Sequence, residues 1–321
     1  MTPQHPLPSG FSAGSTAADV MRDVDMSGKT AIVTGGYSGI GLVTIRALVE
    51  CGAHVIVPAR DIVRAQDRMT GLGGVDIFAM DLSDPVSIDS FCADVMGRNS
   101  AISLLINSAG IMATPLARDR FGREMQFATN HLGHFRLLCR LWPALAADGA
   151  RVVSVSSRAH QICGVDFDDI DFKHRPYDKW QAYGQSKTAN ALFALALDQR
   201  GQRHGVRAFS VHPGQIATGL ARHLSEEEIA AFRTRDDAGN LIIDPARDRK
   251  TVEQGAATSL WCATSPALDG LGGVYCEDCD IAAPNVEGLG RKGVASWATD
   301  PMAAERLWEL SEAMTGCNLT G

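Results

Sequence analysis

Short apolar runs alternate with segments of helical periodicity along most of the chain. The runs share a length of about five residues and cover Lys29–Thr34, His54–Val57, Val75–Ala79, Ile102–Ile106, Arg151–Val155 and Val206–Val211. Helices are expected between and after them, over residues 40–51, 63–72, 85–96, 123–147 and 179–203. A strand that is apolar on both faces is typical of a parallel sheet covered by helices on either side. The alternation therefore predicts one doubly wound α/β domain with a parallel sheet of about seven strands.

Several segments depart from this alternation. Residues 1–27 are rich in Pro, Gly and Ser, and their composition predicts a flexible arm because it offers little apolar surface to bury. The folded domain is then expected over residues 28–321. Residues 158–178 and 215–250 are too long for simple connections, so we expect these loops to cover a substrate site. Residues 300–314 predict a capped amphipathic helix as a C-terminal extension.

Composition and charge exclude several classes of function. The chain has 321 residues, 45% of them hydrophobic, and a formal net charge of −7 from 30 Lys and Arg against 37 Asp and Glu. A mildly acidic chain lacks the basic surface of a nucleic-acid binder or of a protein that docks on anionic membranes. No apolar run approaches the roughly 20 residues of a spanning helix. With eight scattered cysteines and no export signal at the N-terminus, the predicted location is the reducing cytoplasm.

A glycine-rich turn follows the first predicted strand, with the sequence TGGYSGIG from Thr34 to Gly41. Gly35 allows a sharp turn, Gly39 allows the backbone to approach a pyrophosphate, and Gly41 allows the helix to pack close to the strand. The N-terminus of that helix supplies free N–H groups and the positive end of its dipole. A tight turn without a ligand is the alternative. The position between strand and helix in the first unit favours a dinucleotide site.

Further motifs follow the later strands in a recognisable order. They are Asp81-Leu82 after the third strand, Asn107-Ser108-Ala109-Gly110 after the fourth, Asn130 within NHLGHF, Ser156-Ser157 at the end of the fifth strand, Tyr183-Gly184-Gln185-Ser186-Lys187, and Pro213-Gly214 after the sixth strand. This series resembles the TGxxxGIG, NNAG and YxxxK motifs of the short-chain dehydrogenase/reductase superfamily, with Ser108 in place of an Asn. The resemblance covers roughly residues 28–280. Within the superfamily, the sequence is most similar to the retinol dehydrogenase and carbonyl reductase branch.

The resemblance implies a Rossmann-type fold, a nicotinamide cofactor and a set of residues that bind it. Those residues are Gly35, Tyr37, Ser38, Gly39, Ile40, Arg60, Asp81, Leu82, Asn107, Ala109, Gly110, Tyr183, Lys187, Pro213, Gly214, Ile216 and Thr218. Members of the superfamily commonly pair the two long helices after strands four and five. A homodimer or homotetramer is therefore expected, and a monomer is left open because insertions can block those faces.

The residues after the second strand bear on the choice of cofactor. They are Pro58-Ala59-Arg60, and the nearest carboxylate, Asp61, lies beyond Arg60. An acidic side chain at this point holds the ribose 2′-hydroxyl of NAD, whereas an Arg accommodates the 2′-phosphate of NADP. Arg60 as a solvated surface charge is the plainer alternative. We expect NADP(H), with NAD(H) as the second candidate.

Tyr183 and Lys187 are the predicted centre of proton transfer. They stand four residues apart on a helix and so share one face, and the ammonium is expected to lower the phenol pKa from about 10. The resemblance implies that Ser157, rather than Ser156, bonds the substrate oxygen. It also implies that Lys187 holds the nicotinamide ribose and that Asn130 supports a chain of water molecules to Lys187. Asn130, Ser157, Tyr183 and Lys187 are thus the predicted catalytic residues.

These features predict an enzyme that interconverts a carbonyl and an alcohol by hydride transfer, with Tyr183 as general acid and base. Apolar side chains in the two loops, Ile162, Val165, Phe167, Ile216, Leu220 and Leu224, favour a fairly large apolar substrate, although they can equally pack against one another. An NAD-linked alcohol dehydrogenase is one alternative. A dinucleotide sensor without catalysis is another, and the presence of both Tyr183 and Lys187 disfavours it.

No metal site is expected. Cys276 and Cys279 form a lone CxxC without a second pair at zinc-site spacing. His131 and His134 lie three residues apart on a helix, where a pair of this kind is more often packed than metal-bound. The aspartates between residues 166 and 171 lack the Gly and the terminal Glu of a calcium loop. We interpret these groups as buried thiols, packed histidines and a solvated loop face.

Overall fold

The computed structural model describes residues 2–99, 101–232, 236 and 239–319, and its centre is a single sheet. In the described residues the sheet has eight strands in the order β3-β2-β1-β4-β5-β6-β7-β8. Their bounds are β1 Thr30–Thr34, β2 His54–Ala59, β3 Val75–Ala79, β4 Leu104–Asn107, β5 Arg151–Val155, β6 Arg207–His212, β7 Val274–Glu277 and β8 Asp280–Ile281. All neighbours pair in parallel except β7 and β8. The predicted doubly wound Rossmann-type fold is confirmed, with β8 as a short antiparallel addition at one edge.

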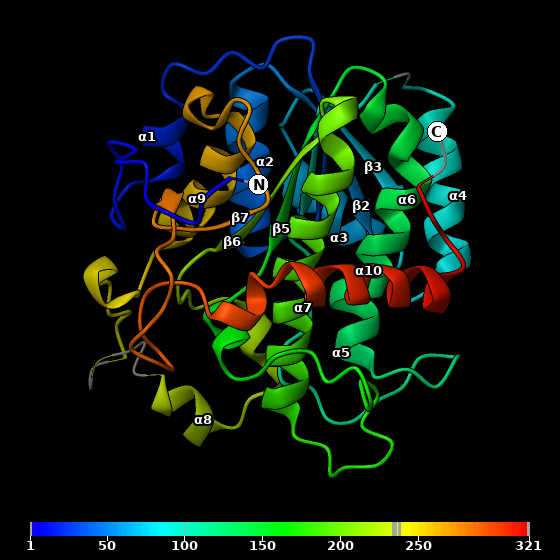
Figure 1. Ribbon diagram of the computed structural model, residues 1–321. Coiled ribbons are helices and arrows are strands. Elements are labelled where there is room, and N and C mark those ends of the chain that lie inside the picture. Colours follow the sequence, from blue (N-terminus) through cyan, green and yellow to red (C-terminus); the bar gives the residue numbers. More distant parts are fainter. Residues whose placement is uncertain (1, 100, 233–235, 237–238, 320–321) are drawn as a thin grey trace.

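Helices cover both faces of this sheet (Figure 1). Their bounds are α1 Ala17–Met21, α2 Gly39–Glu50, α3 Ile62–Met69, α4 Pro85–Met96, α5 Met125–Phe127, α6 Gly133–Ala146, α7 Lys179–Gly201, α8 Glu226–Ala231, α9 Val252–Thr264 and α10 Pro301–Thr315. Short 3₁₀ helices lie at Arg158–Gln161, Gln202–His204, Gly219–His223, Pro245–Arg247, Pro266–Leu268 and Ser296–Ala298. Apolar residues of α1, α2 and α9 form one core cluster with the sheet, and those of α4, α6, α7 and α10 form the other.

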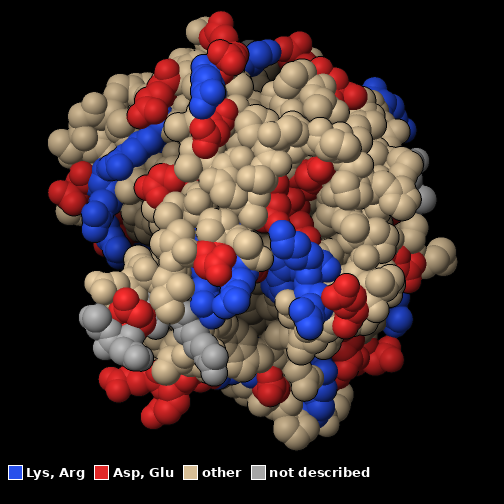
Figure 2. Space-filling view, turned by 90° about the vertical axis from the view of Figure 1, so that its left-hand side faces the viewer, with Lys and Arg blue, Asp and Glu red and all other residues tan. Residues whose placement is uncertain are grey.

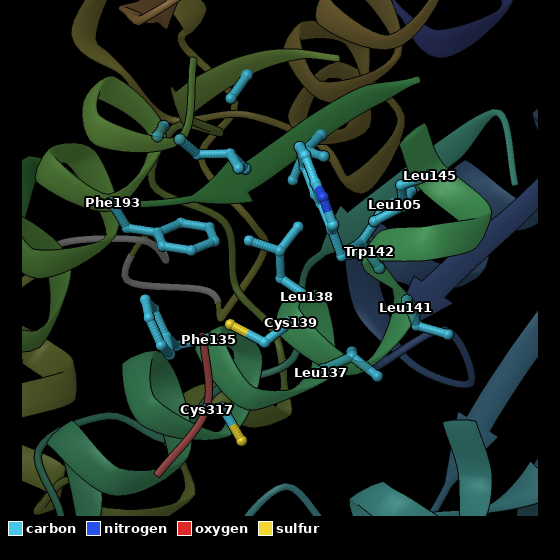
Figure 3. Close-up of a cluster of buried hydrophobic side chains, with 14 of the residues drawn as sticks. Leu105, Phe135, Leu137, Leu138, Cys139, Leu141, Trp142, Leu145, Phe193 and Cys317 are labelled. Atoms are coloured by element: carbon cyan, nitrogen blue, oxygen red, sulfur yellow. The ribbon is translucent and has the colours of Figure 1, made fainter. Parts of the chain in front are cut away.

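The second core cluster is rich in aromatic and aliphatic side chains from α6 and α7. Figure 3 shows Phe135, Leu138 and Trp142 of α6 pointing into this cluster beside Phe193 of α7 and Leu105 of β4. All five side chains are at most 3% exposed. Burial of such side chains contributes about 1.5–3 kcal/mol each. The cluster therefore holds α6 and α7 firmly against the sheet.

The long helix expected over residues 123–147 is divided into three parts. A π-helical turn, η1 Ala128–Leu132, separates α5 from α6. Single π-helical turns within helices are frequent at functional sites. Here Asn130 makes tertiary hydrogen bonds from within the turn, and Gly133 packs directly against the carbonyl of Leu82. Such contacts are not encoded in helical periodicity, which is why the sequence predicts a regular helix.

Residues 2–27 lie on the body of the protein, in contrast to the flexible arm expected over residues 1–27. Val20 and Met21 of α1 are buried in the cluster of α2 and α9. The side-chain amide of Gln4 donates hydrogen bonds to the carbonyls of Tyr275 and Ala282, at 2.7 and 2.6 Å. The few apolar residues of this segment pack into that cluster, which average composition does not reveal. Within the described part of the chain, no helix combines the length and apolarity needed to cross a bilayer.

Candidate active site

Tyr183 and Lys187 lie on α7, which passes the carboxyl end of β5. The side chain of Asp178 caps the start of α7 by accepting the backbone N–H groups of Trp180 and Gln181 at 2.9 and 2.8 Å. The helix presents both Tyr183 and Lys187 inward, and they are 4% and 5% exposed. The Lys187 ammonium lies 5.6 Å from the centre of the Tyr183 ring. The structure thus brings together the phenol and the cation that the sequence pairs.

The acidity of Tyr183 is governed by burial. Burial raises its pKa to about 12, and a hydrogen bond with the Ser157 side chain opposes that rise. This corrects the expectation that Lys187 lowers the phenol pKa in the protein alone. The Lys187 ammonium donates to the carbonyl of Val155 at 2.9 Å, and burial lowers the pKa of Lys187 to about 8. Each group is therefore displaced toward its neutral form because a buried charge loses its hydration.

The two adjacent serines face different partners. Ser156 is buried, and its hydroxyl donates to the carbonyl of Lys187 at 2.7 Å. Ser157 is partly exposed; its Oγ accepts the backbone N–H of Ala159 at 3.1 Å and bonds with Tyr183. Ser157 is consequently the serine that stands beside the phenol, at the position that the resemblance implies.

Asn130 is held within the π-helical turn by its side chain. Its Oδ1 accepts the N–H of Ile111 at 2.9 Å, and its Nδ2 donates to the Ile111 carbonyl and to Ser186 Oγ, both at 2.9 Å. Ser186 lies on α7 between Tyr183 and Lys187 and donates to the Tyr183 carbonyl at 2.8 Å. Asn130 is fully buried. It therefore links the segment after β4 to the helix that carries the phenol.

The glycine-rich turn follows β1. In the sheet β1 lies beside β4, and this is where the strand order reverses direction. Gly35 has φ +69°, and a Cβ there would lie 2.8 Å from the Cα of Ala109. At Gly41 a Cβ would lie 2.5 Å from the Gly35 carbonyl oxygen. Ser38 precedes α2 without a capping hydrogen bond from its side chain. The first N–H groups of α2 thus have no side-chain cap from Ser38. Open α/β sheets bind ligands at the point where the strand order reverses, and we call the region between this turn and the end of β4 the crevice.

An unsatisfied amide marks the same crevice. Both polar atoms of the Asn107 side chain, at the end of β4, are buried without a hydrogen-bond partner. A buried amide without partners is costly, and a ligand with polar groups would supply them. Ala109 lies against the Gly35 turn and Gly110 lies near Asn130 and Lys187. The residues of this crevice therefore fit a dinucleotide.

The other cofactor-binding candidates are distributed around the crevice. A Cβ added at Gly39 would lie 3.3 Å from Thr218. A Cβ added at Gly255 would lie 2.5 Å from Ile216 and 2.9 Å from Ile40. Gly214, after Pro213 and β6, lies against the aliphatic part of Lys250. Thr218 thus lies beside the glycine-rich turn, which contains the partly buried Tyr37.

The remaining candidates, Asp81, Leu82 and Arg60, follow β3 and β2. The Asp81 carboxylate accepts the N–H and O–H of Ser83 at 2.8 and 2.7 Å, and Leu82 is buried. Arg60 is exposed at the end of β2. The neighbouring Asp61 caps α3, where its Oδ1 accepts the N–H of Arg64 at 3.0 Å. The acidic side chain is thus occupied at the helix and the basic one is open to solvent.

The loop 215–250 carries α8 onto the start of α7 (Figure 1). Glu228 Oε2 accepts the Lys179 ammonium at 2.7 Å, and Glu228 Oε1 accepts the indole N–H of Trp180 at 3.2 Å. The Trp180 ring lies 5.8 Å from the Phe232 ring and 6.3 Å from the Tyr183 ring. A cavity of about 250 Å³ lies within this loop, lined in part by apolar side chains of residues 216, 241–243 and 252.

The loop 158–178 differs from the apolar wall expected from sequence. Val165 and Phe167 pack against the core cluster of α4, α6, α7 and α10, and the Arg306 guanidinium lies 4.4 Å from the centre of the Phe167 ring. These two side chains therefore stabilise the loop. The aromatic side chain beside Tyr183 is Trp180. The sequence does not single out Trp180, because no local pattern indicates its contact with Phe232.

The loop 215–250 is anchored near its C-terminal end by partly buried polar contacts of Asp248 and Lys250. His212 Nε2 lies 2.8 Å from Asp248 Oδ2, and Arg158 bonds the same carboxylate at 3.3 Å. Lys250 pairs with Asp278 at 2.6 Å.

Acidic and basic side chains are interspersed over the face that carries α1, α8 and α9 (Figure 2). In the residues that the structure describes, no three His, Cys, Asp or Glu side chains gather as metal ligands would.

Comparisons with known proteins agree with this geometry. The family model for short chain dehydrogenases matches residues 29–229. A probable oxidoreductase of Streptomyces lividans is 45% identical over 89% of this chain and 97% of its own, and human retinol dehydrogenase 12 is 35% identical over 93% and 88%. The crystal structure of an uncharacterised protein from Mycobacterium paratuberculosis superposes with a TM-score of 0.71 at 33% identity, covering 96% of this chain and all of that one. The chain belongs to the short-chain dehydrogenase/reductase family of oxidoreductases and resembles its retinol dehydrogenase branch.

Proposed function

We propose that the protein is an NADP(H)-dependent oxidoreductase that interconverts a ketone or aldehyde with the corresponding alcohol. The observation that carries the proposal is the buried Tyr183 phenol, bonded to Ser157 and set one helical turn from Lys187. A group that can give or take a proton beside a crevice that fits a dinucleotide meets the needs of carbonyl reduction. The raised phenol pKa favours the protonated form, which is the form that reduction requires.

Each residue has a role in this reaction. When bound, the cofactor supplies a hydride to the carbonyl carbon. Tyr183 donates its proton to the carbonyl oxygen as charge develops there, and Ser157 donates a hydrogen bond to the same atom. The positive charge of Lys187 favours the phenolate that remains. In the oxidative direction Tyr183 accepts the proton of the alcohol.

NADP(H) is the cofactor that the residues after β2 favour. The exposed Arg60 offers a planar guanidinium to a 2′-phosphate. Asp61 would repel that phosphate, but its carboxylate is engaged in capping α3. The N-terminus of α2 would receive the pyrophosphate, and Lys187 would receive the nicotinamide ribose.

The proposed substrate is a small molecule with an apolar body. The Trp180 and Phe232 rings lie on the side of Tyr183 toward α8, and Ile216, Leu220 and Leu224 are partly buried in the same loop. Apolar and aromatic side chains around a few polar groups are typical of small-molecule sites. The apolar side chains near α8 therefore support an apolar substrate, whereas Val165 and Phe167 pack against the core.

Tyr183→Phe tests the proposal directly. The variant removes the hydroxyl that transfers the proton and leaves the ring, so we expect carbonyl-dependent NADPH oxidation to fall at least about 100-fold while NADPH binding, measured by fluorescence titration, is retained. Tyr177→Phe is the matched control, because its hydroxyl bonds Thr114 and Glu124 away from the phenol. We expect the control to keep most of its turnover. Turnover retained in Tyr183→Phe would refute the assigned role.

A further inference from the structure

His134, in the first turn of α6, is bonded at both ends of its ring. The side chain is 3% exposed. Its Nδ1 lies 3.0 Å from the carbonyl oxygen of Asn130, and its Nε2 lies 2.9 Å from Oγ1 of Thr34. Thr34 is the last residue of β1 and precedes the glycine-rich turn. The ring therefore bridges the nucleotide crevice and the π-helical turn.

The direction of each hydrogen bond follows from the partners. A carbonyl oxygen can only accept, so Nδ1 carries the hydrogen. Burial, with a smaller contribution from the Lys187 charge, lowers the pKa of His134 to about 4 against the opposing effect of the hydrogen bond to the Asn130 carbonyl. The ring is therefore neutral and Nε2 is an acceptor. The Thr34 hydroxyl then donates to Nε2. Its oxygen accepts the backbone N–H groups of Ser108 and Ala109, both at 3.0 Å.

These bonds form one directed series through the site. It runs from the N–H groups after β4, through the Thr34 hydroxyl and the imidazole, to the Asn130 carbonyl. The side chain of Asn130 continues the connection to Ser186 on α7. A directed series of this kind is polarised along its length. Its two ends lie at the crevice for the dinucleotide and at the helix that carries Tyr183 and Lys187.

His131 provides the contrast. It is equally buried on the same segment, three residues earlier. Its Nε2 lies 2.7 Å from Ser311 Oγ on α10, and its ring packs among Phe127, Phe135 and Phe193. Its contacts are thus with the core and α10, whereas those of His134 are with the crevice and Asn130.

We propose that His134 is a positioning residue that couples cofactor binding to proton transfer. Its Nε2 end fixes Thr34 and the glycine-rich turn, and its Nδ1 end fixes the Asn130 carbonyl beside the Tyr183–Lys187 centre. The catalytic half of this inference rests on the proposed function. The half that concerns dinucleotide binding rests on the crevice alone.

Two isosteric substitutions separate the two ends. In His134→Asn the amide N–H replaces Nδ1–H, so the Asn130 bond is kept and the Thr34 bond is lost. In His134→Gln the amide oxygen replaces Nε2, so the Thr34 bond is kept and the Asn130 bond is lost. We expect the Asn variant to weaken NADPH binding about fivefold and to keep kcat within about twofold. We expect the Gln variant to keep the Kd for NADPH and to lose about tenfold in kcat, since one hydrogen bond corresponds to changes of this size.

His131→Gln is the control for loss of a buried histidine. We expect it to lower the melting temperature while leaving the Kd for NADPH and kcat unchanged. The coupling is refuted if both His134 variants behave as this control does, or if they change the Kd and kcat by equal factors. Wild-type protein that binds NADPH but reduces no carbonyl would refute the proposed reaction instead. The order of the Kd values among the variants, read by fluorescence without turnover, would still decide whether His134 fixes the crevice.

Discussion

Burial outweighs local charge in setting the chemistry of single residues in this protein. Tyr183 has a cation one helical turn away, yet its pKa is raised to about 12 because the phenolate would be desolvated. The Lys187 ammonium is stabilised by the Val155 carbonyl. Arg60, by contrast, is exposed at the end of β2, so what it binds is decided by the shape and charge of the ligand.

Arg60→Ala tests the choice of cofactor. A guanidinium bonded to a 2′-phosphate contributes more than a neutral hydrogen bond, so we expect the KM for NADPH to rise about tenfold or more and the KM for NADH to change less than about twofold. Steady-state kinetics with both cofactors provides the measurement. Arg68→Ala, at the exposed end of α3, should leave both values unchanged. Equal losses with NADPH and NADH would show that Arg60 does not bind the phosphate.

At the scale of elements, α8 and α7 are joined through one carboxylate. Glu228 lies in the first turn of α8 and forms a capping box with Ser225. The Ser225 side chain accepts the Glu228 N–H, and the Glu228 side chain accepts the Ser225 N–H. The same carboxylate bonds Lys179 and Trp180 on α7. These bonds therefore hold α8 against the start of α7, near Tyr183.

Glu228→Gln is expected to loosen this contact between α8 and α7. The amide keeps a hydrogen-bonding group for Trp180 but loses the ion pair with Lys179, so the KM for a bulky apolar carbonyl should rise about threefold while kcat stays nearly constant, as expected for loss of uniform binding. Because the pair is partly exposed, high salt should reduce the difference from wild type. Glu226→Gln, exposed in the same turn, is the control. A fall in kcat without a change in KM would contradict this role.

At the scale of the molecule, α10 covers the face that α6 and α7 would use to pair with a second subunit. Figure 1 shows α10 crossing α7 toward α6. Trp308 stacks on Phe193 with ring centres 6.0 Å apart and meets Phe135 edge-on at 4.9 Å. Arg200 of α7 pairs with Glu305 at 2.5 Å. The dimer expected from the family would require this helix to leave.

We expect the full chain to be a monomer of 34.2 kDa by light scattering, and a chain ending at residue 298 to associate or aggregate through the exposed apolar face. The opposite outcome is a dimer in which α10 stays protected from proteolysis and cross-linking maps the interface to α6 and α7. Such a dimer would show that α10 does not cover this face.

The packing of α10 itself is tested by Trp308→Ala. Trp308 is 2% exposed, so truncation should lower the free energy of unfolding by about 3–5 kcal/mol, measured by chemical denaturation. Met302→Ala on the same helix removes a side chain that is 79% exposed, and we expect a change below about 0.5 kcal/mol. A small effect at Trp308 would show that α10 is weakly held.

Local patterns in the chain were sufficient for the sheet, for the glycine-rich turn and for the pairing of Tyr183 with Lys187. Apolar runs report burial directly, and a spacing of four residues places two side chains on one helical face whatever surrounds them. The π-helical turn, the docking of residues 2–27 and the contact of Trp180 with Phe232 depend on contacts between distant segments. No spacing within the chain indicates them.

The sequence by itself therefore determined the fold class and the pairing of Tyr183 with Lys187, because both follow from the pattern of residues along the chain. Only the tertiary structure decided the protonation preferences of Tyr183 and Lys187, the partners of His134 and the covering of α6 and α7 by α10. Each of these depends on desolvation or on a hydrogen bond between segments that meet only after the chain has folded.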